Sequence, residues 1–453
     1  MVSFGICCIP SNFILMCDTF VHIPPDKRLP VIFGKNSDRE PNEAQHIVRY
    51  PRLTREKNVL QTSYIAVEHP RDVFEVILSK PFQLWGAEIG INEYHVVIGN
   101  EAVFTKIPFE KNNKGLTGMD LIRLSLEISK TAREALEKII FYLEKYGQDA
   151  CGGYENKDFY YHNSFIIADK LEAYVLETAG NFWVYEKAEG HRAISNGLSI
   201  EENYDGIADG AIDFARKKNR IKKEEIFNFK KAFSAFLMPK LAQCEFRRNS
   251  NENLGNSFMD FSIGQAMQIL RSHKTGENYT PYFAQPDSLC MHASGILSPN
   301  QTTGSMIVVL QDDPTIWMTG SSSPCLSLYK PFYLGDILLN EENFIAPSAV
   351  MDHSYWWQWE KFNRGILKNY TERKKLFQDE RNVIEQKWIE QENALRKNNA
   401  SKGSFCQFSK NCLDESKILL NKWSQQISSL PAKKHFFYDK YWSKQNNKAN
   451  FAP

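Results

Sequence analysis

The sequence predicts an α+β fold in which helices pack on a largely antiparallel sheet. The first half of the 453-residue chain contains short segments rich in β-branched and aromatic residues, and turn residues separate them. Two capped helical segments lie between blocks of these strands, which favours a layered α+β domain. From about residue 354 the pattern changes to long amphipathic helices.

The predicted strands fall into three blocks. In the first, Pro24-Pro25-Asp26 supplies a turn between the first two strands. In the second, short connectors join three strands into consecutive hairpins. In the third, which begins near residue 289, the polar turn 311–314 separates two strands. The expected strands are 18–23, 30–34, 63–67, 73–78, 94–98, 164–169, 173–177, 182–186, 305–310 and 315–319.

Capping signals mark the two helices between these blocks. Thr117 is followed three residues later by Asp120, and Thr131 is followed by Glu134, as at the start of a capped helix. Apolar residues recur through both segments, and Gly147 is expected to end the second helix.

The C-terminal quarter is expected to be helical. Spaced apolar residues among Glu, Lys, Arg and Gln predict one or two long helices after residue 354, with a further helix over 416–430. The cluster of Trp356, Trp357 and Trp359 is interpreted as helix packing rather than as a cofactor site. The Lys- and Asn-rich end over 444–453 is expected to fray.

Composition argues against several classes of function. The formal net charge is +1, which gives no electrostatic reason to expect a nucleic acid or an anionic membrane as partner. The nine cysteines show no CxxC or Cys/His spacing of a zinc site, so we expect free thiols in a reducing compartment and no metal or other cofactor. The first sixteen residues lack the basic start and unbroken apolar run of a signal peptide, and no apolar stretch of roughly 18 residues follows. We therefore expect a cytoplasmic protein without a transmembrane segment.

Short polar motifs stand out from this background at 16–20 (MCDTF), 33–39 (FGKNSDR), 90–93 (GINE) and 99–102 (GNEA). Taken singly, each has a structural interpretation, as a buried thiol, an Asx-type turn or a strand end. Taken together, they resemble the secernin and peptidase C69 dipeptidase branch of the cysteine N-terminal-nucleophile hydrolases. The resemblance continues through 85–88 (WGAE), 117–121 (TGMDL), 161–165 (YHNSF), 176–180 (LETAG), 194–196 (ISN) and 317–332.

This resemblance implies a domain organisation. Residues 17–345 would form a four-layer αββα N-terminal-nucleophile hydrolase sandwich, and residues 346–453 a helical C-terminal region that packs on this core. Residues 1–16 would be a leader or a non-native start that is removed.

Cys17 is the candidate nucleophile. The thiolate is the reactive form of cysteine, and a free thiol titrates near ~8.5, so the residue needs a base. An internal peptide nitrogen cannot serve, whereas a free α-amine, with a pKa of ~7.7–8.0, can. Because Met16 precedes Cys17 directly, translation from Met16 followed by removal of the methionine would expose that amine. We favour this route, or a similarly simple processing step, over autocatalytic cleavage of a sixteen-residue leader.

The resemblance also implies roles for other residues. Asp38 would accept a hydrogen bond from the Cys17 amine, and Lys35, which stands where the hydrolase relatives usually carry arginine, would stabilise the thiolate. Asn100 and Asn196 would be oxyanion-hole donors. Arg247 or Arg248 would complete the site, although the sequence around them favours a solvated pair of arginines. His292, in a Cys-Met-His motif, is interpreted as a core residue rather than a metal ligand.

Two functions of different classes follow from the resemblance. The first is hydrolysis of small amides, with dipeptides as the leading substrate class and N-acyl amides behind them. The alternative is a secernin-like role in regulated secretion or exocytosis, through partner binding with little or no peptidase activity. A third interpretation is that an exposed Cys17 is modified to an electrophilic carbonyl group. The sequence leaves a homo-oligomer open.

Overall fold

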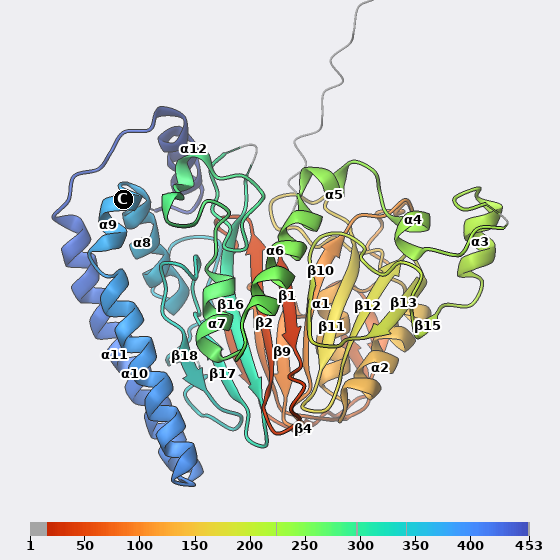
Figure 1. Cartoon of the computed structure of the whole chain (residues 1–453), viewed down its shortest axis with the longest axis horizontal. Helices are drawn as coiled ribbons and strands as arrows, with labels where there is room; N and C mark the ends of the chain where they lie inside the picture. The colour runs from red at the N-terminus through yellow and green to blue at the C-terminus, as the bar shows by residue number, and fades with distance from the viewer. Residues whose placement is uncertain (1–15, 223, 296–297, 341, 452–453) are drawn as a thin grey trace, which may run out of the picture.

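A computed structural model describes residues 16–222, 224–295, 298–340 and 342–451 (Figure 1). Two antiparallel sheets form its centre. The six-stranded sheet has the order β14 (His191–Ile194), β1 (Asp18–His22), β2 (Val31–Arg39), β16 (Gln301–Leu310), β17 (Thr315–Met318) and β18 (Lys330–Phe332). The eight-stranded sheet has the order β15 (Gly206–Ile207), β13 (Phe182–Lys187), β12 (Ala173–Ala179), β11 (His162–Ala168), β10 (Val97–Val103), β9 (Ile89–Asn92), β8 (Val76–Pro81) and β3 (Gln45–Tyr50).

The two sheets stack on each other, and helices cover their outer faces. Strand β1 contacts β10 and β11 across the stack. Helices α1 (Gly118–Leu126) and α2 (Ala132–Tyr146) pack on the eight-stranded sheet, and α6 (Cys244–Ser257) and α7 (Ile263–Leu270) pack on the six-stranded sheet. All nine residues of β2 are buried, as expected for a strand with layers on both faces. The four-layer αββα arrangement expected from the sequence is therefore confirmed.

The remaining elements join or flank these layers. Two small ribbons, β4 (Leu53–Thr54) with β7 (Asp72–Val73) and β5 (Val59–Gln61) with β6 (Ala66–Glu68), follow β3. Short elements connect the layers: α3 (Ala211–Lys217), α4 (Phe229–Phe233), α5 (Met238–Leu241) and the 3-10 turns η1 (Gly276–Asn278) and η2 (Pro281–Phe283). The C-terminal helices are α8 (Tyr355–Leu367), α9 (Tyr370–Lys375), α10 (Gln378–Lys397), α11 (Lys402–Ser428) and α12 (Phe436–Lys448).

The C-terminal helices lie beside the β18 edge of the six-stranded sheet. Helix α11 contacts β18, and α10 lies alongside α11, at the left of Figure 1. Trp356, Trp357 and Trp359 are buried in the packing of α8, in agreement with the interpretation made from the sequence. Within the residues that the structure describes, no helix combines the length and apolar character needed to cross a membrane.

The capping residues and hairpin connectors in the sequence predicted the helix ends and the hairpins correctly. Thr117 and Asp120 form a reciprocal capping box at α1, the Thr131 side chain accepts from Glu134 N–H at α2, and Gly147 ends α2 with φ of 68°. The predicted hairpins over 164–186 are β11, β12 and β13.

Two strands were predicted with the wrong bounds, and one strand and one helix are longer than expected. Residues 94–98 form a turn and only the start of β10, because Asn92 Oδ1 accepts hydrogen bonds from Tyr94 N–H and Val96 N–H. Strand β2 continues to Arg39, where an Asx-type turn was the alternative for the Lys35–Asp38 motif. Residues 63–65 are bends rather than strand, and the helix expected over 416–430 is the second half of α11.

The expected fraying of the C-terminal end was wrong for residues 444–451, and residues 452–453 lie outside the described residues. Helix α12 continues to Lys448, and Phe451 is buried against Trp356 and Trp357. This apolar contact holds the end of the chain in place.

Candidate active site

Cys17 lies between the two sheets, directly before strand β1, and the residue is only 3% exposed. The chain enters from Met16, so the Cys17 nitrogen is a peptide nitrogen in this structure. Met16 is also buried and packs against Ala242 and Met291. The rest of the expected leader, residues 1–15, lies outside the described residues.

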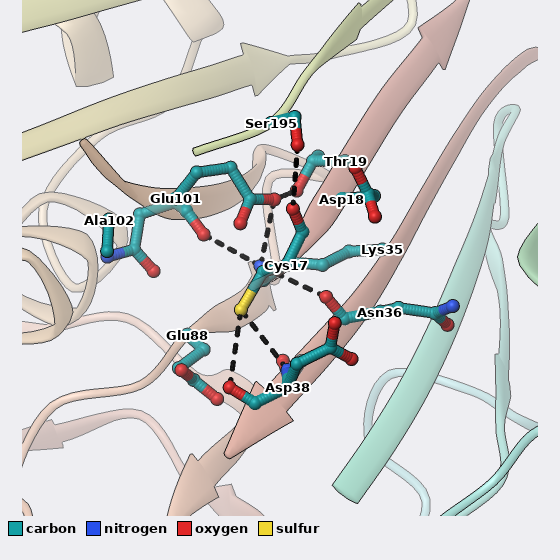
Figure 2. Close-up of polar contacts among 12 residues, drawn as sticks. Cys17, Asp18, Thr19, Lys35, Asn36, Asp38, Glu88, Glu101, Ala102 and Ser195 are labelled. Carbon is teal, nitrogen blue, oxygen red and sulfur yellow. Dashed lines mark hydrogen bonds and ion pairs between the residues drawn. The ribbon is translucent and has the colours of Figure 1, made fainter. Parts of the chain in front are cut away.

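The Cys17 thiol faces the backbone of Asp38 (Figure 2). Asp38 N–H donates to Cys17 Sγ at 3.1 Å, and Asp38 O lies 3.7 Å from the same sulfur. The antiparallel pairing of β1 with β2 explains this approach, since Asp18 is opposite Asn36 in the register. An N–H donor at the sulfur favours the thiolate.

Asn196 and Arg247 hold the backbone of Cys17. Cys17 N–H donates to Asn196 Oδ1 at 2.8 Å, and Arg247 donates to the same oxygen at 2.7 Å. Arg247 also donates to Cys17 O at 3.1 Å and to Asp18 Oδ2 at 2.5 Å. One guanidinium therefore fixes the residue that would carry both nucleophile and base.

Arg247 corrects an expectation from the sequence, which favoured a solvated arginine pair. Its side chain is fully buried, whereas the neighbouring Arg248 is half-buried and donates to Asn249. Arg247 is on the face of α6 that packs against the six-stranded sheet, together with Cys244, Asn251 and Gly255. This spacing of small and polar residues along one helix face was the signal that could have identified it.

Lys35 projects from β2 into the same buried region. Its ammonium donates to Asn100 O at 2.7 Å and to Glu101 Oε1 at 3.1 Å. Burial alone would lower the pKa of Lys35, but the negative charges that Cys17 and Glu101 carry when deprotonated raise it above its usual value. Lys35 therefore keeps its positive charge, and this charge lowers the pKa of the Cys17 thiol electrostatically.

Burial is the main cause of the shifted pKa values of Cys17 and Glu101. It raises the pKa of the Cys17 thiol well above its usual value, and the Lys35 charge opposes this rise. Burial also raises the pKa of Glu101 to about 7, against the opposing charge of Lys35. The resting thiol is therefore protonated and needs a base for activation.

The Asp38 carboxylate does not bond the Cys17 nitrogen in this structure, in which that nitrogen is a peptide nitrogen. The carboxylate accepts from Thr302 Oγ1 at 2.5 Å, while Cys17 N–H is directed at Asn196. The reason is the strand register, which places Thr302 of β16 opposite Asp38 of β2. Burial raises the pKa of the Asp38 carboxyl well above its usual value. Asp38 Oδ2 is buried and has no hydrogen-bond partner among the described residues.

The two asparagines also have contacts that bear on their expected role as oxyanion donors. Asn196 Nδ2 donates to Ala102 O at 2.9 Å, and Asn100 Nδ2 donates to Asn163 Oδ1 at 2.9 Å. The structure thus brings Cys17, Lys35, Asp38 and Asn196 together, and Asn100 reaches the group through its backbone oxygen.

A cavity of about 300 Å³ lies beside this group of residues. Its wall includes Ser195 and Gly197, which flank Asn196. Its lining also carries three cationic side chains, Lys230, Lys240 and Arg248, and one carboxylate, Glu245. A site of this size and charge suits a small molecule with an anionic group.

Metal-binding side chains gather at a separate place. In the described part of the chain, His273, Cys290, His292 and Cys325 form a group whose ligand atoms all lie within 4.8 Å of one another. This arrangement contradicts the reason for treating His292 as a plain core residue, which was the lack of other metal ligands nearby.

Comparison with known proteins confirms the expected relation to peptidase family C69. The model of this family matches residues 85–248, a segment that contains Asn100, Asn196 and Arg247. This match supports hydrolysis of an amide bond.

Solved structures similar to this chain include penicillin V acylase from Agrobacterium tumefaciens, at 13% identity and a TM-score of 0.43, covering 72% of this chain and 89% of that one. Two variants of the conjugated bile acid hydrolase from Clostridium perfringens are also similar, both at 11% identity and covering 71% of this chain and 94% of theirs, with TM-scores of 0.36 and 0.38.

Proposed function

We propose that this chain is a cysteine-dependent N-terminal-nucleophile amidohydrolase that cleaves small amides, with dipeptides as the leading substrates. The observation that carries this proposal is that hydrogen bonds hold both the backbone nitrogen and the sulfur of Cys17 in place. Asn196 and Arg247 hold its nitrogen and carbonyl, while the Asp38 backbone N–H meets its sulfur. These contacts would hold in one orientation a residue that supplies both nucleophile and base.

The proposed reaction begins with removal of the residues before Cys17. The freed α-amine accepts the thiol proton, and Sγ attacks the carbonyl carbon of the substrate amide. Collapse of the tetrahedral adduct breaks the C–N bond, and the protonated amine returns its proton to the departing nitrogen. Water, deprotonated by the same amine, then attacks the thioester and releases the acid with regeneration of the Cys17 thiol.

Unpartnered oxygens near Cys17 support a free amine at this position. Among the described residues, Asp38 Oδ2 and Glu101 Oε2 are buried without a hydrogen-bond partner, which is costly. A peptide nitrogen carries one N–H, whereas a free amine carries more. The additional donors would improve the satisfaction of this acceptor-rich site.

The proposed substrate class rests on the neighbouring cavity. Lys230 is ion-paired with Glu201 and Glu245. The remaining cations of the lining, Lys240 and Arg248, suit the C-terminal carboxylate of a dipeptide. A free dipeptide is therefore expected to be hydrolysed faster than the same dipeptide with an amidated C-terminus. Equal rates for the two would argue for neutral N-acyl amides instead.

The test is a panel of dipeptides and N-acyl amides with protein that begins at Cys17. Cys17→Ala should abolish turnover, and Cys412→Ala, which removes a buried thiol of α11, should not. Mass spectrometry of a rapidly quenched reaction should find the acyl group on the Cys17 peptide. A wild-type protein that turns over no member of the panel would overturn the proposal and favour a partner-binding role in regulated secretion.

A further inference from the structure

The cluster of two thiols and two imidazoles lies outside the proposed reaction at Cys17. Cys290 and His292 are in the segment before β16, Cys325 is in the loop between β17 and β18, and His273 follows α7. Cys290, His292 and Cys325 are buried, and His273 is half-buried. The fold thus assembles the cluster from three separate segments of the chain.

The spacing of these groups suits a tetrahedral metal ion. His292 Nε2 lies 3.2 Å from Cys325 Sγ and 3.7 Å from Cys290 Sγ. A zinc ion with bonds of about 2.0 Å to nitrogen and 2.3 Å to sulfur separates its ligand atoms by roughly 3.3–3.8 Å. All four candidate ligand atoms lie within 4.8 Å of one another, so small side-chain movements would complete the tetrahedron.

The chemistry of the donor set selects zinc. Two sulfur and two nitrogen donors in a tetrahedral arrangement are typical of a structural Zn²⁺ site. Two thiolates also balance the charge of one divalent cation, so the buried complex is neutral. Burial of a neutral complex avoids most of the cost of placing an isolated charge in the protein interior.

Neighbouring groups hold the imidazoles in place and leave a ring nitrogen available. The ring of Tyr279 stacks on His273 with a centroid distance of 3.8 Å, and the Tyr370 hydroxyl lies 3.8 Å from Cys325 Sγ. Within the described ranges, His273 Nε2 is a buried polar atom without a hydrogen-bond partner. Buried polar atoms without a partner are uncommon and indicate a missing interaction.

The position of the cluster explains what a bound ion would do. Residues 271–300, between α7 and β16, contain only the two short turns η1 and η2 in their described part. A connection of this length with so little regular structure needs another source of order. Ligands at 273, 290 and 292 would tie both ends of this segment to the β17–β18 loop through Cys325.

The same segment reaches the candidate active site. Met291, between two of the ligands, packs against Met16, and its N–H donates to Thr302 Oγ1 at 2.9 Å. Thr302 in turn donates to the Asp38 carboxylate. An ion at the cluster would therefore fix one wall of the Cys17 site.

We propose that His273, Cys290, His292 and Cys325 bind one Zn²⁺ in a closed structural site that orders residues 271–295 beside Cys17. On binding, the two thiols release two protons to solvent, and both sulfurs and one nitrogen of each imidazole donate to the ion. Four protein ligands leave no position for a catalytic water, so the ion has a structural role.

The first test is elemental analysis of the full-length chain purified under reducing conditions. We expect about one zinc per chain in the wild type and in Cys17→Ala, which separates this site from the proposed nucleophile. Cys325→Ser and His292→Gln should each lose most of the zinc. Cys412→Ser, which changes a buried thiol elsewhere, should keep it. Zinc retained in both ligand variants would overturn the proposal.

A second measurement uses only the wild-type protein, in case the ligand variants do not fold. Alkylation of thiols with and without a chelator, followed by peptide mass spectrometry, should show zinc-dependent protection of Cys290 and Cys325. Replacement of the ion by Co²⁺ should give the intense visible bands of a tetrahedral thiolate complex. A protein that contains no zinc and takes up none from added Zn²⁺ under reducing conditions, or that carries a Cys290–Cys325 disulfide as isolated, would contradict the proposed site.

Discussion

Replacement of Arg247 by alanine removes the cation that joins three parts of the Cys17 site. Arg247 donates to Cys17 O, Asp18 Oδ2 and Asn196 Oδ1, and both charged side chains of its ion pair with Asp18 have no exposed surface. Loss of one partner leaves the Asp18 carboxylate buried without its counter-ion, which costs about 3–5 kcal/mol. This is a large part of the roughly 5–15 kcal/mol that stabilises a typical domain.

Urea denaturation followed by tryptophan fluorescence measures this loss. Arg247→Lys keeps the charge but loses the planar fork, so we expect an intermediate loss of roughly 1–3 kcal/mol. Arg248→Ala is the matched control, because Arg248 is adjacent, half-buried and bonded only to Asn249 by a side-chain hydrogen bond among the described residues. We expect its free energy of unfolding to change by no more than about 0.5 kcal/mol.

A double variant tests the physical cause. Asp18→Asn combined with Arg247→Met removes both charges, so the loss should be smaller than for Arg247→Ala alone. A loss below about 1 kcal/mol for Arg247→Ala, or an equal loss for Arg248→Ala, would refute the buried ion pair as the support of this site.

Three further predictions concern the same site. Asn196→Ala should lower kcat by ~10²–10³ with a smaller change in KM, measured by steady-state hydrolysis, and an unchanged kcat would exclude Asn196 from the reaction. The double variant Lys35→Met/Glu101→Gln removes a buried pair together, and its Cys17 thiol should need a higher pH for alkylation by iodoacetamide, because Lys35 lowers the Cys17 pKa by more than Glu101 raises it. Glu101 binds its proton more tightly when folded, with a pKa of about 7 against 4.5, so its contribution to stability is complete below pH 4.5 and is lost as the pH rises through 7. The fall in unfolding free energy over this range should therefore be smaller in the double variant than in the wild type, and an equal fall would contradict the raised pKa.

Local patterns in the sequence predicted the layers of this fold because local interactions determine them. The Thr117 and Thr131 caps and the turn at Gly147 depend on residues within one helical turn. The hairpins of β11, β12 and β13 depend on short connectors. The turn at 92–96 was missed because the Asn92 side chain makes contacts that only the folded chain provides. Its Oδ1 accepts from the turn, while its Nδ2 donates to Leu126 O and Ser129 O near the end of α1.

In the candidate site, too, the sequence predicted what local motifs determine and missed what tertiary contacts determine. Cys17, Lys35 and Asp38 were placed by motif, and strand pairing of β1 with β2 brings them together. Arg247 could not be assigned, because its partner Asp18 is 229 residues away in the chain. The bond from Thr302 to the Asp38 carboxylate was not foreseen, since the facing residue of β16 is set by sheet register rather than by the motif.

The zinc proposal depends on contacts of the same non-local kind. Cys325 is 33 residues from His292, and His273 lies on the far side of an irregular segment. No Cys/His spacing in the sequence indicated the group. Its four members become apparent only when α7, the segment before β16 and the β17–β18 loop are placed in space.

The N-terminus of the active protein tests the central claim most directly. Cys17 can act as its own base only if its nitrogen is a free amine, and in this structure Met16 precedes it. Intact-mass measurement and N-terminal peptide mapping of protein that hydrolyses amides should identify Cys17 as the first residue. Full activity from a chain that still carries Met16 or earlier residues would contradict the account.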